Sequence, residues 1–209
     1  MTPESLNRRP ACLGSTFYKN DTCEVAKSLL GKILVRKLGS SGSISYLAGC
    51  IIETEAYGYR DDPASHAYNG VRTRNSMMFG NTGCLYVYFI YGKHFCANLT
   101  ARKHDAEAGA VLIRAILPIE VNGRFKNPII GPGRVTESLS INLAHNGIDV
   151  TQETSLVSIH QGLGIADLET NTRIGISKAT DRPWRYTAIQ FAAPFETGVL
   201  QRQNHKPNF

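Results

Sequence analysis

The first periodic stretch of the chain has apolar side chains at helical spacing. It covers residues 23–30 and follows Asp21 and Thr22, either of which can cap the first turn of a helix through its side-chain oxygen. Gly31 stands where such a helix would end, because glycine readily adopts the left-handed conformation of a C-terminal cap. We therefore predict a helix over residues 23–30.

Extended strands are predicted where β-branched and aromatic residues cluster in short runs. These runs are residues 32–37, 46–55, 85–90 and 110–115, with shorter ones at 156–160, 174–176 and 186–191. A second, short helix is predicted over residues 135–142. Because strands and helices do not alternate in regular units, the pattern favours an α+β domain over a parallel α/β fold.

The chain shows no sign of division into parts. No internal repeat, low-complexity tract or linker interrupts it, so we expect one domain over residues 1–209, with residues 1–14 as a flexible N-terminal segment. Residues 122–134, which end in Gly131, Pro132 and Gly133, are interpreted as a long surface loop.

Composition narrows the chemistry. The N-terminal residues carry no apolar run, so we expect neither a signal peptide nor a membrane anchor. We therefore expect a cytoplasmic protein, which in a bacterium would be associated with the nucleoid. The five cysteines are widely spaced and form no Cys-x-x-Cys pair, which argues against disulfides and zinc and favours free thiols. The six histidines lack ligand spacings, so we expect no metal and no cofactor. A net charge of +6 suggests a polyanionic partner.

Two carboxylates and a tyrosine alternate in the run that starts at Glu53. In a strand, Glu53, Glu55 and Tyr57 project from one face. An exposed, polar strand face is the simpler interpretation of such a pattern. The surroundings favour a pocket instead, because an apolar run precedes the carboxylates and aromatic side chains follow them, among them His66 and Tyr68. Aromatic rings can stack on a purine and contribute about 1–3 kcal/mol per base.

A predicted β-hairpin spans residues 85–98, with its tip around Gly92. Tyr88 and Tyr91 are three residues apart, so Tyr88 can line a pocket while Tyr91 protrudes from the tip. A protruding aromatic beside a lysine suits a wedge that enters the minor groove of DNA and fills the gap left by a flipped nucleotide. The alternative is that these tyrosines are ordinary strand aromatics, half packed into the core.

Four motifs carry a resemblance to a known family. They are Glu53-Thr54-Glu55-Ala56-Tyr57, Arg72-Thr73-Arg74-Asn75, Tyr86-Val87-Tyr88-Phe89-Ile90-Tyr91-Gly92 and Ile113-Arg114-Ala115. In sequence, order and separation they resemble the alkyladenine (3-methyladenine) DNA glycosylases. The resemblance runs through residues 29–133 and more loosely through 173–176 and 183–186. It implies a curved antiparallel β-sheet core with flanking helices and a protruding β-hairpin, like the C-terminal domain of methionyl-tRNA formyltransferases.

The resemblance also implies a role for each matching residue. Glu55 would be the general base, and Arg114 would hold the nucleophilic water and the adjacent phosphate. The remaining substrate-binding positions would be Tyr57, Ala64, His66, Tyr88 and Asn98, with Asn98 at the pocket floor, where it discriminates against a guanine amino group.

On the DNA-binding side, the resemblance makes Tyr91 the intercalating wedge, with Lys93, Arg72 and Arg74 as further DNA contacts. Lys93 stands where the family commonly has methionine, so it would add a phosphate contact instead of an apolar plug. The residues before Arg74 and the run Asn81-Thr82-Gly83 also depart from the family pattern, and neither departure touches the expected base catalyst.

The implied function is that of a monofunctional DNA glycosylase. Such an enzyme would flip out and hydrolytically excise alkylated or deaminated purines, including 3-methyladenine, 7-methylguanine and hypoxanthine, from double-stranded DNA in base excision repair. With water as the nucleophile, no Schiff base forms and the abasic product is not nicked. A monomer is expected.

Two other classes of function remain as alternatives. The first is a non-catalytic nucleic-acid-binding module of the same fold, which would need no carboxylate in an aromatic pocket. The second is a carbohydrate hydrolase that uses Glu53 and Glu55 as acid and base. Neighbours on one strand face do not readily flank a sugar bond, which disfavours the second class.

Overall fold

The computed structural model describes residues 10–39, 44–90, 92, 94–104, 107–120 and 123–192. The helices are α1 (Thr22–Leu29) and α2 (Pro132–Ser138), with the short 3-10 helices η2 (Ser15–Tyr18), η3 (Thr73–Phe79) and η4 (Leu143–His145). The strands are β1 (Ile33–Leu38), β2 (Ser45–Tyr57), β3 (Leu85–Ile90), β4 (His94–Thr100), β5 (Ala110–Ile119), β6 (Ile129–Ile130), β7 (Val157–His160), β8 (Ile165–Asn171) and β9 (Arg185–Phe191).

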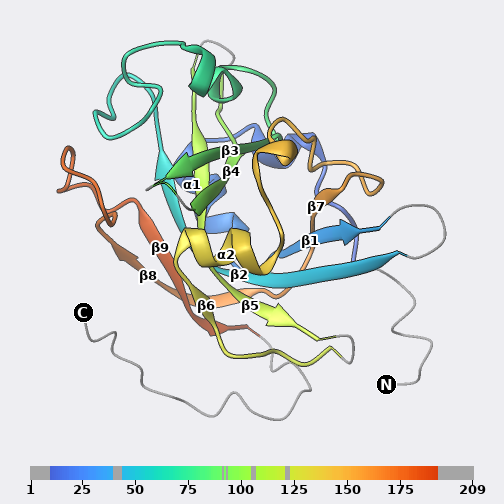
Figure 1. Cartoon of the computed structure of the whole chain (residues 1–209). Coiled ribbons are helices and arrows are strands. Elements are labelled where there is room, and N and C mark those ends of the chain that lie inside the picture. The colour runs from blue at the N-terminus through green and yellow to red at the C-terminus, as the bar shows by residue number, and fades with distance from the viewer. Residues whose placement is uncertain are drawn as a thin grey trace.

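The described strands form one curled, antiparallel sheet, against which the two α-helices lie (Figure 1). Its central path is β3-β4-β5-β2-β1-β7, while β6 pairs with β5 and β9 pairs with both β2 and β8. The predicted α+β class, with few helices and an antiparallel sheet, is confirmed. The likeness to the formyltransferase domain stays a prediction.

Helix α1 forms where its capping residue and apolar face predict it. The Asp21 side chain accepts hydrogen bonds from the backbone N–H groups of Cys23 and Glu24, which would otherwise lack partners in the first turn. Val25 and Leu29 are buried in the core. The helix is therefore held by a local cap and by packing against β2 and β5.

A double irregularity in the sheet shapes the end of β2. Ile51 pairs with Ile116 and Glu53 with Ala115, so Ile52 has no partner in β5. The next pair is Thr54 with Ile113, which leaves Arg114 without a partner in β2. A β-bulge re-aims the side chain beside it and increases the local twist. Thus Arg114 comes to lie against both glutamates of β2.

Two expectations about the second half of the chain were wrong. Residues 174–176 form no strand, and Gly175 has a positive φ of 76°, which breaks extended structure. The expected loop at 122–134 contains β6 and the first turn of α2, and the helix begins three residues before the predicted 135. Pro132 explains the earlier start, because proline at the first helical position has a suitable φ and needs no hydrogen-bond acceptor.

The predicted hairpin is present as β3 and β4, in a register that pairs Tyr88 with Cys96 and Ile90 with His94. The residues assigned to its tip as wedge and phosphate contact, Tyr91 and Lys93, lie outside the described residues. None of the helices in the described ranges is long and apolar enough to cross a membrane.

Candidate active site

Glu55 lies near the end of β2 and has no exposed surface. Its Oε1 accepts a hydrogen bond from the backbone N–H of Ile174 at 2.7 Å, and its Oε2 accepts one from the Tyr57 hydroxyl at 2.9 Å. Nη1 of Arg114 lies 3.3 Å from Oε2. The contacts come from β2, β5 and the β8–β9 connection, so segments far apart in the chain fix this carboxyl group.

Burial raises the pKa of Glu55, because an anion loses its hydration when it leaves water. The Arg114 charge, the Ile174 N–H and the Tyr57 hydroxyl oppose this rise, and the net direction is upward. Burial also raises the pKa of Tyr57, with Glu55 adding to the effect. Tyr57 therefore keeps its proton and donates a hydrogen bond to the carboxylate.

Glu53 shares one guanidinium with Glu55. Its Oε1 lies 3.3 Å from Nε of Arg114 and accepts a hydrogen bond from Nη1 of Arg185 at 3.1 Å. The expectation that Glu53, Glu55 and Tyr57 project to one side is therefore confirmed. Arg114 joins the two carboxylates, and Arg185 adds a second cation at Glu53 only.

A cavity of about 690 Å³ opens beside this group. Its wall includes Tyr57, His66, Tyr88 and Arg114, which the sequence placed in one site. Glu55 itself is fully buried and is not part of the wall, whereas its partners Tyr57 and Arg114 are. The carboxylate therefore lies directly behind the cavity surface, within hydrogen-bond reach of groups that form that surface.

The aromatic side of the cavity is a packed cluster. His66 stands edge-on to Tyr88 with ring centroids 4.7 Å apart, and Nδ1 of His66 lies 3.0 Å from the Tyr86 hydroxyl. Burial lowers the pKa of His66, and the charge of Arg74 lowers it further. The imidazole is thus neutral near pH 7, with Nδ1 already engaged and, among the described residues, no hydrogen-bond partner at Nε2.

Comparison with known proteins identifies the family. The model of the methylpurine-DNA glycosylase family matches residues 16–190. This chain belongs to that family. DNA glycosylases cleave N-glycosyl bonds by hydrolysis, so the chain is a hydrolase that acts on DNA.

Several bacterial relatives are provisionally named 3-methyladenine DNA glycosylases. The one from Ehrlichia ruminantium is 40% identical over 184 residues, which cover 86% of this chain and 93% of the relative. The one from Koribacter versatilis is 37% identical over 209 residues, covering 94% and 98%. The one from Prosthecochloris aestuarii is 41% identical over 180 residues, covering 81% and 84%.

Two other expected base contacts of the glycosylase, Ala64 and Asn98, make hydrogen bonds within the protein. Ala64 lines the cavity, but its N–H donates to Oδ1 of Asp62 at 3.2 Å. Asn98 is buried and does not line the cavity, because its side-chain amide donates to the backbone carbonyl of Tyr86 at 3.0 Å. The role of Asn98 at the pocket floor stays a prediction, and in this structure its amide links β4 to β3.

Two of the expected DNA contacts of the glycosylase, Arg72 and Arg74, lie outside the cavity wall. Arg72 and Arg74 are exposed at and just beyond the start of η3. This short helix is tied back by Asn75, whose side chain donates to the carbonyl of His66 at 2.7 Å. The arginines are thus presented to solvent next to the aromatic side of the cavity.

Sequence reasoning missed part of the glycosylase's cavity wall. Cys96 lines it, and period two along β4 could have indicated this residue, since Cys96 and Asn98 share a strand face. His94 and Arg134 also line it. The connection between β8 and β9 adds residues 174–178, which carry no local chemical signal in the sequence.

Proposed function

We propose that this glycosylase flips alkylated or deaminated purines out of double-stranded DNA and hydrolyses their N-glycosyl bond with a water activated by Glu55. The observation that carries the proposal is the placement of Glu55. It is a fully buried carboxylate held by Arg114, Tyr57 and the Ile174 N–H, directly behind an aromatic cavity.

Cleavage of the bond between a purine and its sugar develops positive charge on the sugar. A carboxylate near that carbon stabilises the charge and accepts a proton from the attacking water. Among the described residues, Oε1 of Glu55 accepts a hydrogen bond only from the Ile174 N–H, which leaves a second lone pair of that oxygen for the water. The Arg114 contact of 3.3 Å is longer than a typical charge-assisted bond, so a modest shift of the guanidinium admits the water.

The cavity suits a flipped base in size and character. Pockets that bury a small ligand commonly measure about 300–1,000 Å³, with apolar walls and a few polar groups. Tyr57 and Tyr88 supply ring faces for stacking, and the neutral His66 supplies Nε2 for the edge of the base. Cationic bases such as 3-methyladenine and 7-methylguanine leave readily, whereas neutral hypoxanthine depends more on hydrogen bonds from the pocket.

The first expected result is release of free 3-methyladenine, 7-methylguanine or hypoxanthine when the protein is incubated with methylated or deoxyinosine-containing duplex DNA. Chromatography of the released bases measures it. Binding without release would support the alternative of a non-catalytic module. Incubation of damaged single strands beside the duplex tests the preference for double-stranded DNA.

The proposed mechanism is monofunctional, so the abasic product should stay unnicked until it is treated with alkali. Lys178 makes this part of the test informative, because it lines the same cavity. An enzyme that nicks forms a Schiff base, usually from an amine activated by burial, and Lys178 is exposed. Strand cleavage without alkali, or trapping of a covalent complex by borohydride, would contradict the monofunctional mechanism.

The wedge role of Tyr91 stays a prediction from the sequence. We expect Tyr91→Ser to weaken nucleotide flipping more than the chemical step, because flipping costs a few kcal/mol that the wedge helps to offset. A 2-aminopurine placed beside the lesion reports flipping through its fluorescence, and single-turnover excision reports the chemistry. Equal fluorescence changes in the wild type and the variant would count against the wedge.

A further inference from the structure

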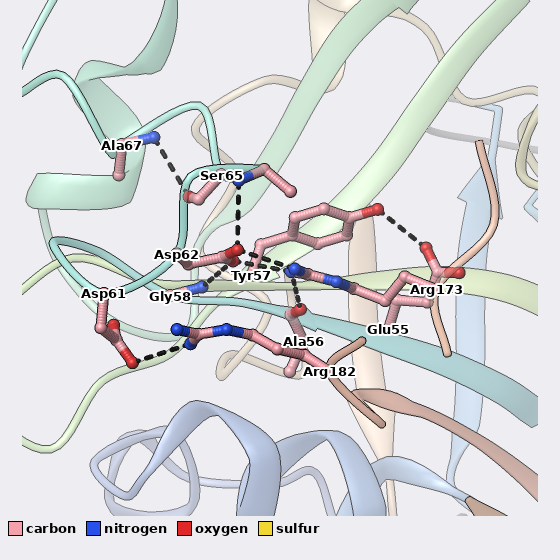
Figure 2. Close-up of polar contacts among 11 residues, drawn as sticks. Glu55, Ala56, Tyr57, Gly58, Asp61, Asp62, Ser65, Ala67, Arg173 and Arg182 are labelled. Carbon is pink, nitrogen blue, oxygen red and sulfur yellow. Dashed lines mark hydrogen bonds and ion pairs between the residues drawn. The ribbon is translucent and has the colours of Figure 1, made fainter. Parts of the chain in front are cut away.

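Two ion pairs join the loop after β2 to the connection between β8 and β9 (Figure 2). The buried ion pair is Asp62 with Arg173, and the exposed ion pair is Asp61 with Arg182. Both pairs link the same two segments of chain. Both guanidiniums lie over the Trp184 ring, but the pairs differ in burial and only Arg173 also reaches β2, so one pair serves as an internal control for the other.

The buried ion pair is fully removed from solvent, with neither side chain exposed. Its geometry is bidentate: Nη1 and Nη2 of Arg173 donate to the two oxygens of Asp62 at 2.6 and 2.7 Å. The carboxylate also accepts hydrogen bonds from the backbone N–H groups of Gly58 and Ala64. Asp62 therefore organises the loop that supplies Ala64 to the cavity wall.

Arg173 also contacts the C-terminal end of β2, which carries Glu55. Its Nη1 donates to the carbonyl of Ala56 at 2.9 Å, and its guanidinium lies 4.7 Å from the ring centroid of Tyr57. The next residue along the chain is Ile174, whose N–H donates to Glu55. Arg173 thus reaches the strand that carries Glu55 and fixes the backbone that binds it.

We propose that the buried ion pair of Asp62 and Arg173 is a positioning device for Glu55. It holds the Ile174 N–H on Oε1 and the Tyr57 ring in the place where its hydroxyl meets Oε2. The inference rests on the proposed catalytic role of Glu55. A buried ion pair is a weak source of net stability, because both charges lose hydration, whereas its directional hydrogen bonds define geometry well.

The positioning has an electrostatic consequence. The hydrogen bond from Ile174 and the one from Tyr57 each lower the pKa of Glu55, against the larger effect of burial. If a substitution of Arg173 lets the Ile174 N–H and the Tyr57 hydroxyl move away from the carboxylate, the pKa of Glu55 rises further. Because excision requires ionised Glu55, the rate then begins to fall at a higher pH as the solution is acidified. The acid limb of the pH–rate profile therefore moves to higher pH.

The exposed ion pair provides the matched control. Nη1 of Arg182 lies 3.1 Å from Oδ2 of Asp61, and the guanidinium stacks 4.6 Å from the Trp184 ring centroid. Among the described residues, neither Asp61 nor Arg182 lines the large cavity, and no hydrogen bond or ion pair joins either of them to Glu55 or Tyr57. The same substitution can therefore be made in both pairs.

The experiment compares Arg173→Lys with Arg182→Lys in single-turnover excision from damaged duplex across a range of pH. Lysine keeps the positive charge but not the planar fork. We expect Arg173→Lys to slow excision by about ten-fold to a hundred-fold, as misplaced catalytic groups do, and to move the acid limb to higher pH. Arg182→Lys should leave the rate within about two-fold and the limb in place.

Asp62→Asn is the second variant, in case Arg173→Lys fails to fold. Removal of the negative charge of Asp62 would by itself lower the pKa of Glu55 and move the acid limb to lower pH. Loss of positioning moves the limb to higher pH instead. An upward shift supports the proposal. An unchanged or lower limb, or a loss of rate that is uniform across pH and follows the melting temperature, overturns it.

The outcomes also separate this inference from the proposed function. If Glu55→Gln excises as fast as the wild type, Glu55 has no catalytic role, whatever the arginine variants do. If Glu55→Gln is inactive while Arg173→Lys behaves like Arg182→Lys, Glu55 keeps its role and the positioning device is rejected.

Discussion

Glu55→Gln is expected to slow single-turnover excision by about 10²-fold to 10⁴-fold, the range for loss of a positioned general base. Glutamine has nearly the same shape but cannot take a proton from water or balance positive charge on the sugar. Its amide nitrogen would also face donors, because the Ile174 N–H, the Tyr57 hydroxyl and Arg114 all point at this carboxyl group. Excision measured with enzyme in excess over damaged duplex tests the prediction.

The stability of this variant should not explain the loss. A carboxyl group whose pKa is raised in the folded state stabilises the fold below its unfolded pKa, and this contribution disappears as the pH rises through the folded pKa. The ionised form therefore costs stability at neutral pH, and neutral glutamine relieves that cost. This relief opposes the poor fit of the amide nitrogen to the donors around it, so we expect a melting temperature at pH 7 close to that of the wild type.

Glu53→Gln is the matched control, since it neutralises a carboxylate on the same face of the same strand. Glu53 touches Arg114 and Arg185 and has no contact with the Ile174 N–H. If Glu55 alone is the general base, Glu53→Gln should excise at least about ten times faster than Glu55→Gln. Equal losses in the two variants would mean that either carboxylate, or only their summed charge, carries the reaction.

Local rules were enough to predict much of the sheet and the first helix. The strand over residues 85–90 is found with those bounds, and the helix over 23–30 is displaced by one residue. In both places the signal is short-range: β-branched and aromatic residues in a run, or a capping aspartate followed by apolar residues. Period two also placed Glu53, Glu55 and Tyr57 on one side.

The parts of the site that depend on distant contacts could not be predicted in this way. The bulges that bring Arg114 to the glutamates arise from strand pairing, which no local pattern specifies. Asp62 and Arg173 are 111 positions apart and look like ordinary surface charges in the sequence. Ile174 contributes through its backbone, so its side chain carries no signal for the contact with Glu55.

The side-chain contact of Asn98 also depends on the fold and could not be predicted from the sequence. Asn98 lies within the stretch that resembles the family, and it shares a strand face with Cys96 of the cavity wall. Whether a side chain in such a place reaches the cavity depends on which hydrogen bond its amide makes. Here the amide donates to the carbonyl of Tyr86, and the residue is buried in the sheet.

The second large effect is expected for Arg114→Gln, which should slow excision near pH 7 by about 10²-fold to 10³-fold, comparable to removal of one preorganised charge-stabilising donor. The Arg114 charge is the strongest of the influences that lower the pKa of Glu55 against the effect of burial. Without it, the pKa of Glu55 rises and less of the carboxyl group is ionised at neutral pH. Glu53 retains Arg185 as a partner, so the loss falls chiefly on Glu55.

This mechanism fixes the sign of the pH dependence for Arg114→Gln. Because ionised Glu55 is the active form, excision falls as the pH drops through its pKa, and a raised pKa moves that fall to higher pH. The variant should therefore recover part of its activity when the pH is raised. Arg185→Gln, which removes the second partner of Glu53 and a hydrogen bond to the Thr172 carbonyl, should show a smaller loss and a smaller shift. A loss for Arg114→Gln that is constant across pH would show that the guanidinium acts on the DNA phosphate and not through the ionisation of Glu55.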